Sequence, residues 1–242
     1  MIRAFEVSYD GTAYAGWQVQ DNARTIQGVI EHSLEGVLKQ QVRITYAGRT
    51  DAGVHAIGQV ISFLSESSMT GEQFRRALNA LLPQDIRIMK TLEVGPDFHP
   101  RYSARARWYR YIIWNGQELV PFFRTYSLWL NRQIDVSRLK SYCKRIVGEY
   151  NFTSFASLEQ DENPTRKVFS CEVYRKDDFI LLDIVANSFL RKMVRAIVGT
   201  FLKLELKGER PERIDEMLHA EDRGSAGETA YAGGLYLAKV FY

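Results

Sequence analysis

The first group of residues that could do chemistry surrounds one carboxylate, Asp51, in the segment YAGRTDAGVHAI at 46–57. Glycines at positions 48 and 53 let the chain turn sharply there and let a ligand come close to the backbone. Arg49, two positions before Asp51, favours the ionised form of the carboxylate. An ionised carboxylate in such a loop can act as a nucleophile or a general base. Aspartate also commonly hydrogen-bonds its own turn, so the segment alone leaves a purely structural role open.

The second group is the segment RYSARARWYRY at 101–111, in which arginines alternate with aromatic side chains and no acidic residue intervenes. Arginine pairs with phosphates and aromatic rings stack on bases, a combination that suits single-stranded or looped RNA. In a strand, Arg107, Tyr109 and Tyr111 would share one face. An ordinary two-faced strand, with aromatic side chains in the core and arginines in solvent, would produce much of the same pattern. The arginines are Arg101, Arg105, Arg107 and Arg110, and the other aromatic residues are Tyr102 and Trp108.

The third group lies in SFLRKMVRAIVG at 188–199, where Arg191, Lys192 and Arg195 fall in the first two turns of a predicted helix. The helix dipole disfavours cations at that end. Arg191 and Lys192 can be solvated, but Arg195 has Val198 and Gly199 one turn further on. We therefore expect Arg195 to have an anionic partner, either a carboxylate such as Asp51 or an RNA phosphate. A long arginine side chain that reaches solvent is the alternative.

Composition excludes several classes of protein. The chain has 242 residues, 45% hydrophobic and 25% charged, which is typical of one large or two small globular domains. Its formal charge of +3 suits an acidic partner without demanding one. Two cysteines without a CxxC motif and four scattered histidines argue against a disulfide framework or a metal centre, and His55 and His99 are expected to be structural. With no signal peptide or membrane span recognised, a cytoplasmic, cofactor-free protein is predicted.

Hydrophobic periodicity and turn residues predict the elements that carry these groups. Strands are expected over 3–11, 41–48, 58–64, 85–94, 108–115, 168–178, 179–187 and 233–242. Helices are expected over 25–40 with Thr25 as cap, 71–82 with Thr70 as cap, 137–148, 188–206 with Asn187 or Ser188 as cap, and 211–222. Strict βαβ alternation and a glycine-rich phosphate loop are both missing, which favours an α+β fold with a mainly antiparallel sheet. A soft boundary near 103–106 divides the chain into halves at 1–104 and 105–242.

These motifs resemble the tRNA pseudouridine synthase A family, which isomerises uridine in the anticodon arm of tRNA. The resemblance runs in order along nearly the whole chain, and GRTDAGVHA is highly specific for the family. The other matching stretches are YDGTAYAGWQVQ, TIQGVIEHSL, LPQDIRI, FHPRYSARARWYRYII, GEYNFTSF, NSFLRKMVRAIVG and GLYLAKV.

The resemblance implies a role for four residues at matching positions. Asp51 corresponds to the essential aspartate of the family, and Tyr109 to the tyrosine that packs against the target uracil and is proposed to take the C5 proton. Arg195 corresponds to the arginine that pairs with the aspartate, and Arg49 to the arginine thought to help displace the target base. Trp108 departs from the pattern, because relatives often have a basic residue there.

The resemblance also implies a pseudouridine synthase fold, with a mainly antiparallel sheet flanked by helices and two similar halves around a central cleft. It implies a homodimer with a basic tRNA-binding surface, no metal or other cofactor, and uridines thirty-eight to forty of tRNA as targets. Candidate RNA contacts are Arg101, Arg105, Arg107, Arg191 and Lys192. A non-catalytic RNA-binding protein would leave the acidic loop unexplained. A glycosidic hydrolase would normally call for a second acid, and none is evident.

Overall fold

The computed structural model describes residues 1–242 as two compact units. Unit 1 comprises Met1–Arg105 and Tyr236–Tyr242, and unit 2 comprises Ala106–Leu235. The sequence had assigned the whole of 105–242 to one half, whereas the structure returns the end of the chain to unit 1. The difference arises because a strand near residue 236 pairs with one near residue 55, and pairing across such a distance leaves no local signal in the sequence.

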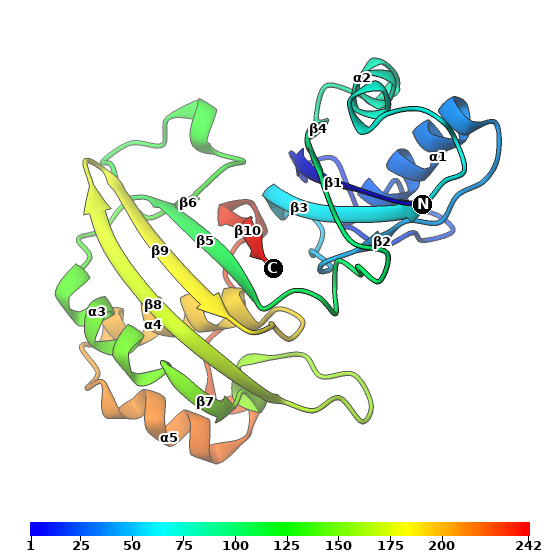
Figure 1. Cartoon of the computed structure of the whole chain (residues 1–242). Coiled ribbons are helices and arrows are strands. Elements are labelled where there is room, and N and C mark those ends of the chain that lie inside the picture. Colours follow the sequence, from blue (N-terminus) through cyan, green and yellow to red (C-terminus); the bar gives the residue numbers. More distant parts are fainter. The chain divides into compact units, whose positions relative to one another are not determined.

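Unit 1 is a sheet covered by two helices (Figure 1). The strand order is β4 (Ile86–Leu92), β1 (Ile2–Tyr9), β3 (His55–Leu64) and β10 (Leu235–Phe241), with the short β2 (Thr45–Tyr46) also paired to β3. β1 is antiparallel to both of its neighbours, and β10 runs parallel to β3. The helices are α1 (Ile26–Leu38) and α2 (Gly71–Leu81).

The helix caps predicted in unit 1 are confirmed. The Thr25 hydroxyl accepts a hydrogen bond from the Gly28 N–H, and Thr70 forms a capping box with Gln73 at the start of α2. The strand expected over 41–48 is mostly wrong, because only Thr45–Tyr46 pairs. The residues before it turn to α1 instead, where the Ile44 N–H donates to the Glu31 carboxylate at 3.1 Å.

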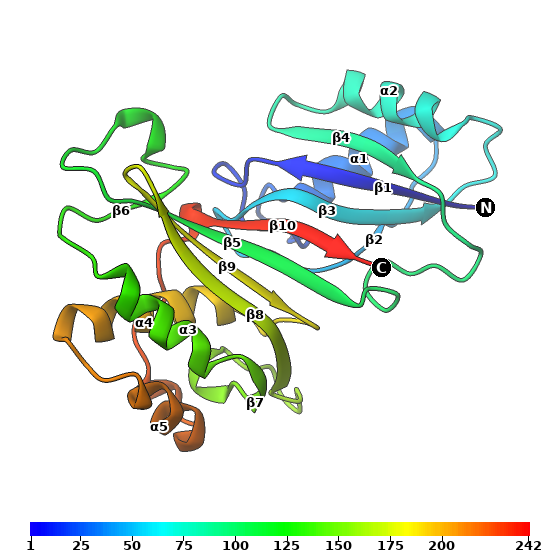
Figure 2. The same cartoon turned by 60° about the vertical axis from the view of Figure 1, so that its left-hand side comes forward.

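Unit 2 contains the other five strands, with three helices along one side of them (Figure 2). The strand order is β5 (Ala106–Trp114), β9 (Phe179–Ala186), β8 (Thr165–Lys176) and β7 (Gly148–Asn151), all antiparallel, and β6 (Leu128–Trp129) pairs in parallel with β5. The helices are α3 (Val136–Arg145), α4 (Met193–Lys207) and α5 (Glu212–Ala220). Short 3₁₀ turns cover Pro121–Phe123, Thr153–Phe155, Arg223–Ser225 and Ala232–Gly234. The predicted α+β class with a mainly antiparallel sheet is confirmed in both units.

The turn between β8 and β9 has the form expected from its two aspartates. Lys176 pairs with Phe179, so Asp177 and Asp178 alone make the connection. Asp177 has a φ of 52°, in the left-handed region that tight hairpins favour. The hairpin was therefore predicted correctly.

The predicted start of the long helix is wrong. α4 begins at Met193, after Lys192 adopts a left-handed conformation with a φ of 62°. Asn187 was expected to cap the helix, but its side-chain oxygen accepts hydrogen bonds from the Lys167 and Ser188 N–H groups and so fixes the bend after β9. Arg191 and Lys192 consequently precede the helix, and Arg195 alone of the three cations lies in its first turn.

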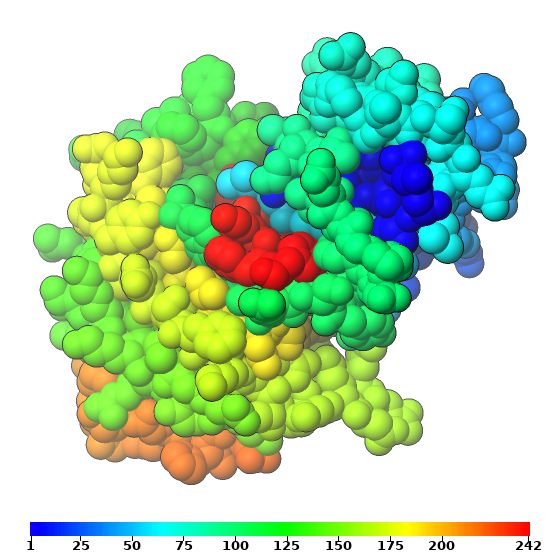
Figure 3. Space-filling model, in the orientation of Figure 1, coloured from blue at the N-terminus to red at the C-terminus, as the bar shows by residue number.

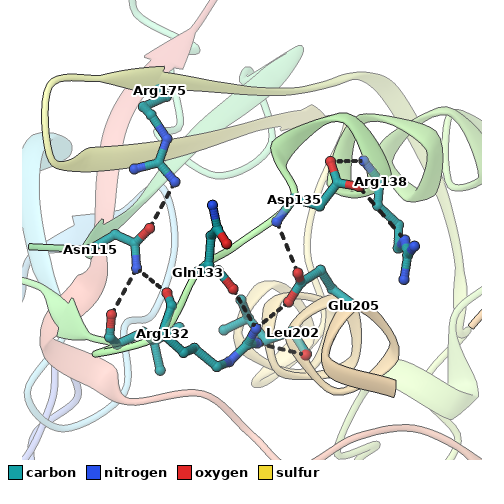
Figure 4. A network of polar contacts seen from close by, with 9 residues as sticks. Asn115, Arg132, Gln133, Asp135, Arg138, Arg175, Leu202 and Glu205 are labelled. Atoms are coloured by element: carbon teal, nitrogen blue, oxygen red, sulfur yellow. Dashed lines mark hydrogen bonds and ion pairs between the residues drawn. The ribbon is translucent and has the colours of Figure 1, made fainter. Parts of the chain in front are cut away.

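The C-terminal half of α4 is joined to the start of α3 by a polar network (Figure 4). The buried Glu205 carboxylate accepts from Arg132 Nη1 at 2.5 Å and from the Asp135 N–H at 2.9 Å. Asp135 in turn caps α3 by accepting from the Ser137 N–H. Arg132 Nη2 also donates to the Leu202 carbonyl oxygen, so one ion pair serves both helices.

Two kinds of feature are absent from the structure. No helix has the length and apolar character needed to cross a membrane. No group of three or more His, Cys, Asp or Glu side chains is arranged to hold a metal ion.

Candidate active site

The Asp51 loop connects β2 to β3 and is fastened to the sheet at its start. The Ala47 N–H donates to the Val60 carbonyl at 3.0 Å, and Gln59 Nε2 donates to the Gly48 carbonyl at 2.7 Å. Gln59 is completely buried in β3, so this side chain holds the loop from beneath. Asp51 itself is half-buried, and its carbonyl accepts from the Val54 N–H at 3.1 Å, which closes the turn.

Residue Thr50, directly before Asp51, is held on two sides. Its hydroxyl lies 2.7 Å from the hydroxyl of Tyr9 at the end of β1, and its carbonyl accepts from the Trp17 N–H at 3.0 Å. Trp17 is fully buried between Tyr9 and Tyr46, with ring centroids 5.7 and 5.2 Å away. The carboxylate is therefore carried on a loop whose backbone is fixed immediately beside it.

Two glycines outside the loop make room for it. Gly16 has a φ of 100°, and a Cβ there would lie 2.8 Å from the Thr50 carbonyl oxygen. A Cβ at Gly11 would lie only 2.0 Å from the Val54 carbonyl oxygen. The sequence analysis attributed the clearance to the loop's own glycines and missed these two. The signal that could have found them is the YDGTAYAGW stretch, which the resemblance includes but which the local argument did not use.

Arg49 lies at the surface of the same loop. Its Nε donates to the Tyr46 hydroxyl at 3.4 Å, so the side chain extends over the aromatic layer formed by Tyr46 and Trp17. An exposed guanidinium beside a half-buried carboxylate gives this side of unit 1 both an anion and a cation that a substrate can contact.

His55, which follows the loop as the first residue of β3, has a structural position. It is almost completely buried, and its ring stacks on Tyr236 with centroids 4.8 Å apart. Its Nδ1 lies 3.1 Å from the Gly11 N–H and 3.1 Å from an oxygen of Asp10. These contacts connect the turn after β1 to the end of the Asp51 loop, in agreement with the structural role expected for this residue.

In unit 2, the arginine–aromatic segment forms β5, and its side chains alternate as predicted. Arg107, Tyr109 and Tyr111 all lie on the buried face. Arg107 Nη1 donates to the Asn187 carbonyl at 2.7 Å. Tyr109 pairs with Ile184 of β9, and its ring meets Phe189 edge to face with centroids 5.0 Å apart. Tyr109 thus has an aromatic neighbour that fixes the plane of its ring.

Trp108 and Arg110 lie on the opposite face of β5 and share one carboxylate. Trp108 Nε1 and Arg110 Nε both donate to one oxygen of Asp183, at 2.9 and 2.8 Å, and Arg110 Nη2 reaches the other oxygen. The Arg110 guanidinium also lies 5.0 Å from the Trp108 ring. The hydrogen bonds to Asp183 raise the pKa of Arg110 further. Trp108 therefore supports the Arg110–Asp183 ion pair.

Arg195 is half-buried in the first turn of α4, and its side chain is hydrogen-bonded to the backbone of a neighbouring segment. Its Nε donates to the Ala230 carbonyl at 2.8 Å, and the Ala230 N–H donates back to the Arg195 carbonyl at 3.0 Å. This reciprocal pair joins the helix to the loop before the last strand. The acceptor is a backbone carbonyl, so the anionic partner expected for Arg195 stays a prediction.

The candidate RNA-binding residues of unit 1 lie in the turn after residue 98. Arg101 and Arg105 are exposed, and the Arg101 guanidinium lies 5.7 Å from the ring of Tyr102, which is 76% exposed. His99 Nδ1 accepts from the Arg101 N–H at 3.1 Å and supports the turn from within. The turn thus presents two cations and an aromatic ring on a backbone that is internally bonded.

This turn is also fixed to the end of the chain. The Tyr242 hydroxyl donates to the Pro100 carbonyl at 2.9 Å, and the rings of Phe98 and Tyr242 lie 4.9 Å apart. Figure 3 shows the last residues, in red, at the surface next to the segment near residue 100. In unit 2, Arg191 is exposed and Lys192 is half-buried, both just before α4.

The candidate residues are therefore divided between the units. Asp51 and Arg49 belong to unit 1, and Tyr109 and Arg195 belong to unit 2. Unit 1 supplies a carboxylate on a fixed loop, and unit 2 supplies a phenol on a strand and an anchored guanidinium. Such groups suit acid–base or nucleophilic chemistry on a substrate with an aromatic base and phosphates.

Comparison with known proteins agrees with this chemistry. A family model described as tRNA pseudouridine synthase matches residues 6–103 and 142–242. The tRNA pseudouridine synthase A of Francisella tularensis subsp. novicida is 39% identical over 98% of this chain and 92% of its own length. That of a Thermotoga species is 40% identical over 98% of this chain and 97% of its own length.

Solved structures are similar at a much lower level. An archaeal box H/ACA Nop10–Cbf5 complex has a TM-score of 0.36 at 13% identity, covering 83% of this chain and 43% of that one. A Cbf5–Nop10–Gar1 complex has a TM-score of 0.38 at 13% identity, covering 98% and 58%. The sequence relationships decide the assignment: this chain belongs to the tRNA pseudouridine synthase A family of tRNA-modifying isomerases.

Proposed function

We propose that the chain converts uridines thirty-eight to forty of the tRNA anticodon arm to pseudouridine, with Asp51 as the nucleophile. The observation that carries this proposal is the support of the Asp51 loop. Hydrogen bonds from β1, β3 and the Trp17 backbone hold the residues around Asp51, although the carboxylate itself is only half-buried. A turn residue with a purely local role would not need this support, whereas a catalytic carboxylate must be held in position before substrate arrives.

The reaction breaks the N1–C1′ glycosidic bond, turns the detached uracil and joins C5 to C1′. The C5 hydrogen is lost as a proton and N1 gains one, so no electrons are exchanged and no cofactor is called for. Asp51 acts either by attacking C1′, which forms a covalent ester, or by removing a sugar proton. Both routes require the carboxylate in its ionised form.

We assign the remaining roles from the contacts within each unit. Tyr109, with its ring plane fixed by Phe189, packs against the uracil and assists loss of the C5 proton. Arg195 acts as the counter-ion that keeps the carboxylate anionic in the complex with tRNA. The target base must leave its stack, which costs a few kcal/mol. Exposed Arg49, with its Nε on the Tyr46 hydroxyl, is suited to occupying the space that the base leaves.

The proposed tRNA contacts come from both units. Arg101 and Arg105 are exposed beside Tyr102, and Arg191 is exposed before α4, so these side chains can reach phosphates. Lys192 is half-buried and Arg107 is buried, and these two residues complete the proposed set. We further propose that a homodimer forms the full tRNA-binding surface and that the enzyme acts on tRNA in the cytoplasm.

The test uses tRNA that carries tritium at C5 of its uridines. Isomerisation releases tritium to water while the chain stays intact. Hydrolysis would instead release free uracil, and a protein that only binds RNA would release neither. Mapping the modified positions then decides whether the targets are uridines thirty-eight to forty.

Asp51→Asn tests the nucleophile directly. We expect the rate of tritium release to fall about 10⁴-fold or more, as for other essential nucleophiles, with tRNA binding nearly unchanged. Asp21→Asn, which alters an exposed carboxylate of the same unit, is the matched control and should turn over at the wild-type rate. Near-normal turnover by Asp51→Asn would end the proposal.

A further inference from the structure

The segment at residues 226–231, called the strap below, lies directly against the first half of α4. A Cβ at Gly199 of α4 would be 1.8 Å from the Glu228 carbonyl oxygen. A Cβ at Gly227 of the strap would be 2.7 Å from Thr200 Cα. The two backbones therefore approach more closely than any larger residue at either position would allow.

Side-chain hydrogen bonds fix the first part of the strap. The hydroxyl of the fully buried Thr200 accepts from the Gly227 N–H at 2.8 Å and donates to the Ala196 carbonyl at 2.7 Å. Arg223 Nη1 donates to the Gly227 carbonyl at 2.8 Å, and its Nη2 to the Thr229 hydroxyl at 3.2 Å. Thr200 is thus the buried side chain that attaches the first part of the strap to the helix, and Lys203 Nζ also donates to the Ala226 carbonyl at 3.4 Å.

The second part of the strap presents two consecutive carbonyls to different elements. The Ala230 carbonyl accepts from Arg195 Nε on α4 at 2.8 Å. The Tyr231 carbonyl accepts from the Tyr111 hydroxyl on β5 at 2.7 Å. Two adjacent peptide groups of the strap are therefore held by donors from two different elements, α4 and β5.

Tyr111 is well suited to this task. It is fully buried, and burial raises its pKa while the nearby Arg195 guanidinium opposes that shift. Its hydroxyl therefore remains protonated and donates throughout the working pH range.

We propose that Tyr111 and Thr200 are positioning residues that set the direction of the Arg195 guanidinium through the strap. The inference rests on the counter-ion role proposed above for Arg195. A guanidinium is planar, so an acceptor fixed at Nε determines where its other two nitrogens point. Tyr111 and Thr200 touch neither substrate nor reacting atoms and act only through the Ala230 carbonyl.

The experiment removes each hydroxyl without changing the shape of the core. Tyr111→Phe and Thr200→Val should each lower the single-turnover rate of tritium release by about tenfold, because small misplacements of a catalytic group cost one to two orders of magnitude. The Kd for tRNA should stay within about twofold of wild type, since neither residue contacts RNA. Thr200→Ser keeps the hydroxyl and should restore the rate.

Tyr142→Phe is the matched control. Tyr142 is also fully buried in unit 2, and its hydroxyl donates to a backbone carbonyl, that of Glu209, at the same distance of 2.7 Å. The variant should lose a similar amount of stability in thermal unfolding and retain the wild-type rate. An equal loss of rate in Tyr142→Phe and Tyr111→Phe would mean that reduced stability alone lowers the rate. That result would overturn the inference.

A double-mutant cycle separates this inference from the proposed function. Arg195→Lys keeps the charge but lacks Nε, and in that background Tyr111→Phe should have no further effect on the rate. Fully additive losses would overturn the positioning role. Arg195→Lys at the wild-type rate would contradict the proposed role of Arg195. A slow Arg195→Lys with normal Tyr111→Phe and Thr200→Val would contradict the positioning role alone.

Discussion

Neighbouring segments support the residues proposed for chemistry, largely through backbone atoms. Arg195 is anchored on the Ala230 carbonyl, and the residue before Asp51 is anchored on Tyr9 and Trp17. A backbone acceptor keeps its position better than a flexible side chain. Such support fixes geometry before the substrate binds.

The first prediction at the residue scale concerns the Tyr109 hydroxyl. Tyr109→Phe keeps the ring and its contact with Phe189 but removes the group proposed to handle the C5 proton. The rate of tritium release should fall by about 10²–10⁴-fold, the usual contribution of acid–base catalysis. The Kd for tRNA should be the same as that of the wild type. Normal turnover would show that the hydroxyl has no catalytic part.

The second prediction concerns Gly16, whose φ of 100° and 2.8 Å clearance leave no space for a methyl group. Gly16→Ala should displace the Thr50 carbonyl and lower the free energy of unfolding by about 1–3 kcal/mol. The rate should fall as well, because Asp51 follows Thr50. Gly95→Ala is the control, since a Cβ there meets nothing within 4 Å. Equal behaviour of the two variants would contradict the support assigned to Gly16.

The neighbours of Asp51 in the chain made it a candidate but left a structural role open, and the resemblance to the family implied its catalytic role. Strand alternation predicted correctly that Arg107, Tyr109 and Tyr111 share one face of β5. Sequence reasoning did not find Gly11 or Gly16, whose importance depends on contact with a loop far along the chain. The strap was missed for the same reason. Its acceptors are backbone carbonyls, which every residue has, so no residue type marks them.

At the scale of elements, local signals predicted helices well where a side chain completes the helix end. Thr25 and Thr70 fulfil the expected caps. The start of α4 was predicted wrongly because the side-chain oxygen of Asn187 does not cap the helix. It accepts hydrogen bonds from two other N–H groups, those of Ser188 and of Lys167 on β8. A residue of a capping type marks the start of a helix only if its side-chain oxygen is not already hydrogen-bonded to a tertiary partner.

The prediction at this scale concerns the network between α3 and α4. Glu205→Gln removes the charge that Arg132 faces, and we expect the free energy of unfolding in urea to fall by about 1.5–3 kcal/mol. Glu216→Gln alters an exposed ion pair with Arg210 and should cost less than about 1 kcal/mol. The rate of isomerisation should be unchanged in both. Equal destabilisation would contradict the special role of the Glu205 network.

At the scale of the whole molecule, a formal net charge of +3 is small for a protein that binds the polyanion tRNA. Local clusters therefore have to provide the attraction. Arg101→Gln and Arg105→Gln should each reduce the slope of log Kd against log salt by about 1 for tRNA binding. Arg75→Gln, whose guanidinium is already paired with Glu72, is the control and should leave the slope unchanged. Unchanged slopes for all three would remove these arginines from the tRNA surface.

The C-terminal strand β10 belongs to the N-terminal unit 1, and this has a consequence for folding during synthesis on the ribosome. On the ribosome, His55 and Ala56 of β3 lack the partners Tyr236 and Leu237 until those residues have been synthesised. This stretch directly follows the Asp51 loop, so the sheet next to the loop is incomplete in every nascent chain. Unit 1 is the first to emerge from the ribosome, and its sheet can be completed only after the last residues of the chain have been synthesised.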